Sequence, residues 1–303
     1  MSPRPLATAP RAGDPMARLE RSPFERRALT SLLLTIGVWV AAIVAGIPLV
    51  SVLYMLILRG GARLSGSVFV ELPPAGFEMG GGFGNAIVGT VLMIGIAALI
   101  SIPVGILATV FLTELGPNNQ LAQTARFATK TLTGLPSILA GVFAYAVVVL
   151  ITGTYSAPAG GLALAVLMVP TVVLTAEEAI KAVPKITRDA AHGMGCTRSQ
   201  VIWKVLLPTA TPGILTGVML AVARAAGETA PLLFTALFSG YWPFEGGHPR
   251  LMQPTASLAV LIYNFAGMPF DNQIDLAWAA SLVLVLMVFV INVTSRLLGR
   301  RRA

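Results

Sequence analysis

The chain has very few of the residues that carry redox and metal chemistry. Its 303 residues include one cysteine, Cys196, and two histidines, His192 and His248. A single cysteine excludes an intrachain disulfide, and with only His192 as a nearby base a nucleophilic role is disfavoured. Two histidines in different connecting segments are too few for a metal cluster. We therefore expect neither a metal nor a cofactor bound by this chain.

Motifs of nucleotide hydrolysis and proteolysis are also missing. The sequence has no GxxxxGK followed by Ser or Thr, the loop that cradles nucleotide phosphates. It has no GxSxG or HExxH and no paired carboxylates within its apolar runs. These absences argue against an enzyme and leave transport, signalling or scaffolding, with any ATP-driven work done by a partner.

Charge is scarce as well, at 11% of residues against about 25% in soluble domains. A membrane protein is indicated, because several uncharged runs exceed the roughly 20 helical residues needed to cross a bilayer. The first run is too long for the apolar part of a cleaved signal peptide. The runs are Ala28–Leu58, Ala86–Leu112, Thr131–Ala176 and Leu276–Ser295.

Two parts of this pattern need interpretation. The run Thr131–Ala176 is too long for one helix, and GTYSAPAGG at 153–161 divides it into two helices joined by a tight turn. Another apolar stretch continues past two charges, Arg224 and Glu228, and we predict one helix from Thr211 to Phe238 that contains both. The prediction is an all-α polytopic protein with six transmembrane helices.

The basic residues alternate with the predicted spans. Seventeen of the 21 Lys and Arg fall in connections on the side of the N-terminus, and three fall on the other side. The positive-inside rule places both termini and the 189–208 segment in the cytoplasm. This distribution argues against nucleic-acid binding despite the net charge of +8. We expect residues 1–27 to be a disordered basic tail attracted to the lipid bilayer, and 28–303 to be the transmembrane domain.

The segment Asp189–Pro208 is unusually polar and rich in small residues for a connection between apolar runs. We expect its small residues to face outward, towards a closely approaching protein, and its apolar residues to lie on the body of the molecule. A simple connector between two spans is the alternative. The small residues are Ala190, Ala191, Gly193 and Gly195, and the apolar ones are Val201, Ile202, Val205 and Leu206.

This segment resembles the EAA loop of binding-protein-dependent ABC import permeases, with Asp in place of the usual Glu. The pattern positions are Asp189, Ala190, Ala191, Gly195, Leu207 and Pro208. The resemblance implies the type I ABC importer permease fold in the bacterial inner membrane. It also implies that the loop 187–208, Gly193 included, forms a short coupling helix over Asp189–Gln200 that docks on a cytoplasmic ATPase.

Further motifs are similar to the PstA-type permeases of phosphate ABC transporters, and they extend from Asn85 to Trp278. The resemblance implies four kinds of partner: a homologous PstC-type permease, two ATP-binding subunits that hold ATP and Mg, a periplasmic phosphate-binding protein, and the bilayer. A permease for another oxyanion or small solute, or a membrane phosphate sensor, are the alternatives. The motifs are NAIVGT, PVGILATVFLTE, TGLPSILAGVFAY, ARAAGETAPLLFTA and QPTASLAVLIYNFA.

Arg224 and Glu228 are the chemically suggestive pair, because a charge within a span normally faces a cavity or a partner. Arg offers a planar fork for two phosphate oxygens, and Glu accepts a hydrogen bond from a phosphate hydroxyl that sulfate lacks. An intrahelical ion pair is the alternative. In the resembling family an Arg and a Glu at these positions are implicated in the translocation path, so we assign Arg224, Glu228 and Thr229 to the substrate pathway. The family's frequent basic residue before Thr175 is replaced by Leu174.

Two regions are predicted to flank these sites. Glu177, Glu178, Lys181 and Lys185 are interpreted as a solvated helix end with modest ion pairing between Glu177 and Lys181. In the other connection, Leu258–Phe265 is too short to span and is expected to rest in the interface or dip into the bundle. By resemblance, 239–275 and Leu64–Phe83 face the binding protein.

Overall fold

The computed structural model describes residues 26–300 and is mostly helical. The chain forms two compact units, one ending at Met55 and the other beginning at Leu56. The described part of the first unit is a single apolar helix, α1 (Arg26–Met55). The predicted basic tail lies outside the described residues, apart from its last two positions, which begin α1.

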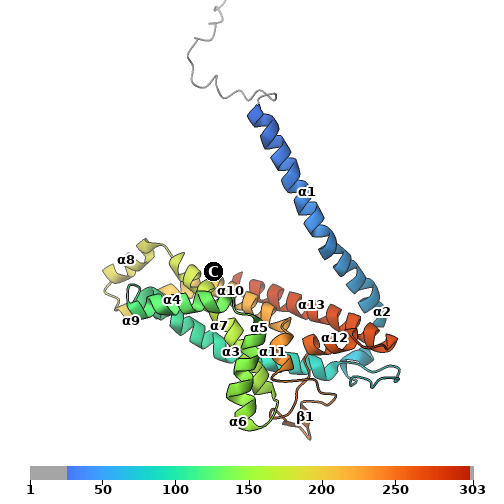
Figure 1. The fold of residues 1–303 in the computed structure, drawn as a ribbon. Coiled ribbons are helices and arrows are strands. Elements are labelled where there is room, and N and C mark those ends of the chain that lie inside the picture. The colour runs from blue at the N-terminus through green and yellow to red at the C-terminus, as the bar shows by residue number, and fades with distance from the viewer. Residues whose placement is uncertain (1–25, 301–303) are drawn as a thin grey trace, which may run out of the picture. The chain divides into compact units, whose positions relative to one another are not determined.

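The second unit is built from helices of very different length. Its long helices are α3, α7, α10 and α13, and short π-helical stretches continue α1, α3, α5 and α9 (Figure 1). In chain order the elements are η2 (Leu56–Gly60), α2 (Gly61–Arg63), η3 (Gly66–Phe69), α3 (Gly84–Val110), η4 (Phe111–Leu115), α4 (Gln120–Thr133), α5 (Ser137–Ala144), η5 (Tyr145–Val149), α6 (Leu150–Thr152), α7 (Ala157–Lys181), α8 (Lys185–Gly193), α9 (Arg198–Gln200), η6 (Val201–Leu206), α10 (Leu207–Ala226), α11 (Ala230–Leu233), β1 (Phe244–Glu245), β2 (His248–Pro249), α12 (Leu258–Ala266) and α13 (Asp271–Arg300).

Five helical stretches are long and apolar enough to cross a membrane, and a sixth results if a bent pair is counted as one span. The pair is Gln120–Thr133 with Ser137–Thr152, and its two halves meet at 108°. The bend follows from Gly134, which ends α4, and from Pro136, which disfavours helical backbone at the residue before it. The predicted number of six spans is reached if this pair counts as one span, and the apolar half of the pair begins at Ser137 and not at Thr131.

The predicted tight turn is confirmed at 153–156, whereas residues 157–161 of the predicted segment are already the first residues of α7. Gly153 adopts the left-handed conformation, with φ of 70°, which a glycine tolerates at a helix end. The next helix, α7, begins at Ala157, and the Ser156 hydroxyl caps it by accepting the Ala159 N–H at 3.3 Å.

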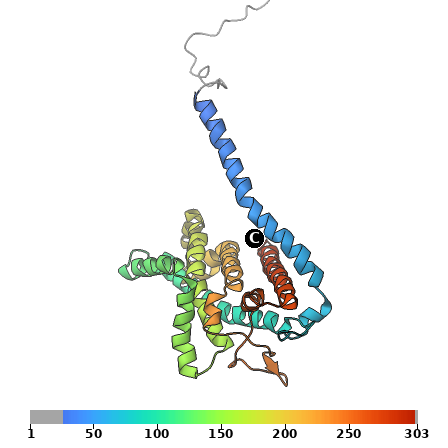
Figure 2. The ribbon, with the colours of Figure 1, turned by 45° about the vertical axis from the view of Figure 1, so that its right-hand side comes forward.

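The helix α7 is the central span of this unit and packs on both α3 and α10, the latter drawn beside it in Figure 2. Small residues let these backbones approach closely. A Cβ on Gly217 of α10 would overlap the Thr175 hydroxyl, and one on Gly105 of α3 would lie 2.6 Å from the Val172 side chain. Within α7's most apolar window, 67% of the residues are buried by the rest of the chain.

The helix α12 packs into the bundle at the end opposite α8 (Figure 1). Leu258, Val260 and Leu261 are fully buried, and the Thr90 hydroxyl of α3 accepts the Leu258 N–H at 2.9 Å. Of the two arrangements expected for this segment, α12 therefore dips into the bundle. Nearby, β1 and β2 pair antiparallel in a two-stranded hairpin.

Candidate functional site

The backbone around Arg224 and Glu228 is broken, which corrects the prediction of one helix from Thr211 to Phe238. The helix α10 ends at Ala226, Gly227 is its C-cap, and the short helix α11 begins only at Ala230. Glycine after the last helical residue and a proline at the start of the next helix are common end and start signals. Arg224 therefore lies in the last turn of α10, whereas Glu228 and Thr229 lie in the break.

The two charges nevertheless meet. Nε of Arg224 donates to Oε1 of Glu228 at 3.4 Å, and the Arg224 side chain is 45% exposed against 16% for Glu228. The contact with Glu228 uses only Nε of the guanidinium, which leaves the two Nη groups as further donors.

The packing of α10 on α7 fixes the depth of Arg224. The two helices run antiparallel, because Gly213 lies against Ala179 and Gly217 lies against Thr175. Two further turns along α10 bring Arg224 level with Met168 on α7. Met168 is close to the middle of Ala157–Lys181, which is long and apolar enough to span a membrane. The pair thus lies at mid-span, where an isolated charge costs at least roughly 2.5 kcal/mol.

The break is held by close packing on its far side. A Cβ on Gly141 of α5 would lie 2.6 Å from the Pro231 Cα, so α11 and α5 are in backbone contact. Leu232 of α11 is buried against Gly160 of α7. The elements on both sides of the break are therefore fixed, and the charges do not lie on a loose loop.

The segment predicted to couple to an ATPase forms two helical pieces, so a single helix over Asp189–Gln200 is wrong. The first piece, α8, already starts at Lys185 and ends at Gly193, and Gly195 then turns the chain with φ of 82°. The Thr197 hydroxyl and the Gln200 side chain form a capping box that starts the second piece. A left-handed glycine between two helices explains why the pattern is interrupted there.

The expected division into an outer and an inner face is largely confirmed. Val201, Ile202 and Leu206 are buried on the body of the molecule, and Val205 is partly buried. Asp189, Ala190, Gly193 and Gly195 are exposed, but Ala191 is buried and faces the core. Leu207 and Pro208 are the first residues of α10 and line an apolar groove of about 630 Å³ between α10 and α3.

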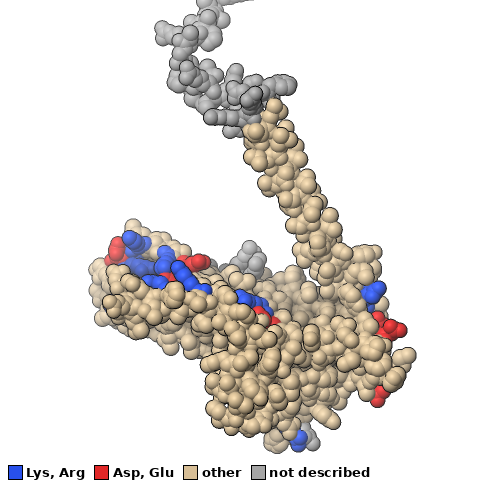
Figure 3. All heavy atoms as spheres, viewed as in Figure 1, with Lys and Arg blue, Asp and Glu red and all other residues tan. Residues whose placement is uncertain are grey.

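Sequence reasoning missed two apolar residues on the outer face of α8. Ile186 is 75% exposed and Met194, just after the helix, is 77% exposed. With Ala190 and Gly193 they follow helical spacing and form one stripe that points away from the body. We call Ile186, Ala190, Gly193 and Met194 the α8 stripe. Lys and Arg side chains gather around α8 and α4 (Figure 3).

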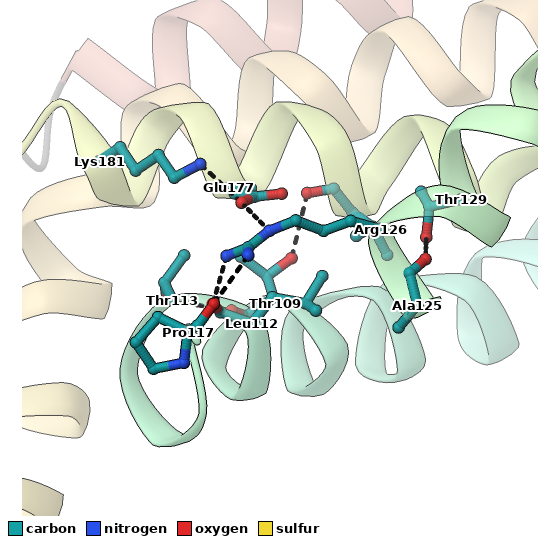
Figure 4. Close-up of polar contacts among 10 residues, drawn as sticks. Thr109, Leu112, Thr113, Pro117, Ala125, Arg126, Thr129, Glu177 and Lys181 are labelled. Atoms are coloured by element: carbon teal, nitrogen blue, oxygen red, sulfur yellow. Dashed lines mark hydrogen bonds and ion pairs between the residues drawn. The ribbon is translucent and has the colours of Figure 1, made fainter. Parts of the chain in front are cut away.

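A polar network near α8 corrects the prediction of a solvated helix end at Glu177, whereas Glu178, Lys181 and Lys185 are exposed as expected. Only 7% of the Glu177 side chain is exposed, and its Oε1 accepts Nζ of Lys181 at 2.6 Å and Nε of Arg126 at 2.9 Å (Figure 4). Arg126 also donates to the carbonyls of Leu112 and Pro117, at 2.6 and 3.0 Å. The predicted pair with Lys181 is confirmed, but Glu177 is covered by a cation from α4.

A second ion pair connects α8 to the same region. Nη1 of Arg188 donates to Oε1 of Glu114 at 2.7 Å, and its Nη2 donates to the Ile180 carbonyl at 2.8 Å. Within residues 26–300, no group of three His, Cys, Asp or Glu side chains is placed to hold a metal ion.

A family model described as binding-protein-dependent transport system inner membrane component matches residues 74–303. The chain belongs to this family. Among curated relatives of this inner membrane component, the phosphate transport system permease protein PstA of Pasteurella multocida is 41% identical over 81% of this chain and 86% of its own length. PstA of Yersinia pestis is 40% identical, with 84% of each chain covered.

Solved structures show the same fold for this inner membrane component. A bacterial alginate ABC transporter chain aligns with a TM-score of 0.61 at 18% identity, covering 92% of this chain and 98% of its own. A chain of the MetNI methionine ABC transporter, in an inward-facing conformation, aligns with a TM-score of 0.57 at 22% identity, covering 72% and 93%. The chain thus has the type I ABC importer permease fold and is a membrane permease subunit that works with other subunits of its transport system.

Proposed function

We propose that this chain is the permease subunit of an ATP-driven importer of inorganic phosphate, and that Arg224, Glu228 and Thr229 line its substrate pathway. The observation that carries the proposal is the arginine at mid-span, next to a break in α10, in a chain about 40% identical to proteins named as phosphate permeases. Glu228 is one anionic partner that offsets the cost of this cation, and because it uses only Nε, the two Nη groups can bind a further anion.

The geometry of the pair supports a division of roles. Glu228 uses its Oε1 on Nε of Arg224, which orients the guanidinium and leaves its Nη groups for two oxygens of an anion. The carboxylate of Glu228 repels a fully ionised anion but accepts a hydrogen bond from a protonated phosphate oxygen. Sulfate has no such proton at neutral pH, so the pair favours phosphate.

The α8 stripe supports coupling to an ATPase subunit. Exposed apolar side chains at helical spacing fit a hydrophobic groove on a partner, and the exposed small residues Ala190 and Gly193 allow close approach. We further propose a homologous PstC-type permease, two ATP-binding subunits and a periplasmic phosphate-binding protein as partners. Both termini and α8 are proposed to face the cytoplasm.

The test is uptake of radiolabelled phosphate and sulfate by the complete transporter in proteoliposomes. Arg224→Gln is expected to lower phosphate uptake at least about tenfold, because a charge-assisted contact is worth roughly 1.5–3 kcal/mol. Glu228→Gln is expected to raise sulfate uptake relative to phosphate, since the amide donates a hydrogen bond to sulfate. Lys130→Gln, an exposed change on α4, is the control and leaves both rates unchanged. Preference of the unaltered transporter for sulfate would contradict the assignment.

A further inference from the structure

One side chain on α8 reaches two other elements. The guanidinium of Arg188 binds Glu114, in the π-helical end of α3, and the carbonyl of Ile180, in the last turn of α7. The Ile180 carbonyl also accepts the Val183 N–H at 3.2 Å, so this contact is made where α7 turns into α8. Arg188 thus connects the helix that carries the α8 stripe to the ends of two spans.

The pair is better shielded from solvent than an ordinary surface ion pair. The side chains of Arg188 and Glu114 are 25% and 15% exposed, and their contact is short at 2.7 Å. Charge-assisted hydrogen bonds of this kind are about twice as strong as neutral ones. Apolar contacts, such as that of buried Ala191, hold α8 against the body but are not directional. Two hydrogen bonds from one planar guanidinium fix both the position and the orientation of α8.

The element that receives this contact is itself connected to the core. Glu114 belongs to η4, Phe111–Leu115, and π-helical stretches of this kind often occur at functional sites. The Leu112 carbonyl in η4 accepts Nη2 of Arg126 at 2.6 Å. One turn earlier, the Thr109 hydroxyl lies 3.2 Å from the Val173 carbonyl of α7. A displacement of Glu114 is therefore passed to both α3 and α7.

We propose that Arg188 is a positioning residue for energy coupling, which makes α8 move together with the ends of α3 and α7. The inference rests on the proposed function, in which an ATPase displaces α8. The covalent connection alone links α8 to α7 and α10, whereas the Arg188–Glu114 contact adds α3 to the moving group. Without it, the ATPase still binds and hydrolyses ATP, but α3 follows a movement of α8 only through its packing on α7.

The experiment measures phosphate imported per ATP hydrolysed by the complete transporter in proteoliposomes, with both rates divided by the amount of assembled complex. For Arg188→Gln and Glu114→Gln, ATP hydrolysis is expected to persist while the ratio falls about tenfold, the loss of one charge-assisted contact. Lys185→Gln is the matched control, because Lys185 is an exposed cation on the same helix. Its ratio stays at the wild-type value.

Two further variants separate coupling from stability. The charge-exchanged pair Arg188→Glu with Glu114→Arg restores the ion pair but not the bond to the Ile180 carbonyl, so it is expected to regain part of the ratio. Arg188→Lys, which keeps one of the two bonds, is expected to lose about threefold. A wild-type ratio in Arg188→Gln and Glu114→Gln overturns the proposal, as does an exchanged pair that assembles but stays uncoupled. If Arg188→Gln does not assemble, the test relies on Arg188→Lys, and a wild-type ratio in that variant overturns the proposal.

The proposed function fails separately from this inference. A wild-type transporter that imports another solute and not phosphate contradicts the phosphate assignment. The ratio is then measured for that solute, and the comparison of the Arg188 variants is unaffected.

Discussion

Replacing Arg126 by Gln removes the cation that faces Glu177 from another helix. Arg126 makes three hydrogen bonds, to the Glu177 carboxylate and to the carbonyls of Leu112 and Pro117. The contact with Glu177 is charge-assisted and worth about 1.5–3 kcal/mol. Lys181 already contacts the same Oε1 at 2.6 Å, but because it is 59% exposed it offsets only part of this loss. We expect the free energy of unfolding to fall by about 2–4 kcal/mol in total.

Changing the other partner of this contact, Glu177, is expected to lower the free energy of unfolding by less. Glu177→Gln keeps an amide oxygen that accepts the Arg126 Nε–H, so the loss is about 1–2 kcal/mol. In the double variant the two losses share one interaction, and their sum exceeds the measured value by about 1–2 kcal/mol. Unfolding of the purified subunit in mixed detergent micelles, titrated with SDS, gives all three values.

The control for this cycle is Lys130→Gln, which removes a cation from the same helix, α4, at an exposed position. Its unfolding curve is expected to match that of the wild type. The reasoning would be refuted by an Arg126→Gln variant as stable as this control. Strict additivity of the Arg126 and Glu177 changes would refute it too, because independent residues do not share a contact.

Other predictions test the close packing and the coupling surface. Gly89→Ala is expected to lower the melting temperature of the subunit, since its Cβ would overlap the backbone before α12, whereas Gly95→Ala, in open space on the same helix, does not. Thr90→Val removes the buried hydroxyl that accepts the first N–H of α12 and costs about 1–2 kcal/mol in the same unfolding assay. Thr124→Val, which loses only an exposed bond within α4, should cost less. Ile186→Asp is expected to reduce copurification of the ATPase subunit without changing the melting temperature, and equal copurification would count against docking on the α8 stripe.

The long elements of the fold could be predicted from the sequence, because runs of apolar residues report directly on membrane spans. The same apolar runs did not show where a helix is interrupted, as between α10 and α11. The end of α10 carries ordinary signals, Gly227 after the last helical residue and Pro231 early in the next helix. They were outweighed by the apolar residues on either side, which continue the same pattern.

The burial of Glu177 depends on a residue 51 positions away in the chain. Local spacing indicated only the pair with Lys181, and periodicity carries no information about which distant helix covers a carboxylate. The exposure of Ile186 and Met194 depends in the same way on where α8 begins and which face it turns inward. Their contacts are tertiary, so single-sequence reasoning had no signal for them.

The central position of α7 has a consequence for the order of synthesis. Its neighbour α3 precedes it in the chain, but α10 is made only after it. Until residues 207–226 have left the ribosome, the surface around Thr175 and Ala179 that α10 later covers has no protein neighbour there. During that time the surface faces lipid. Its small apolar residues are compatible with lipid, and the Thr175 hydroxyl is satisfied within its own helix by a hydrogen bond of 2.8 Å. A charged substitution there would act first on membrane insertion, before any packing is lost.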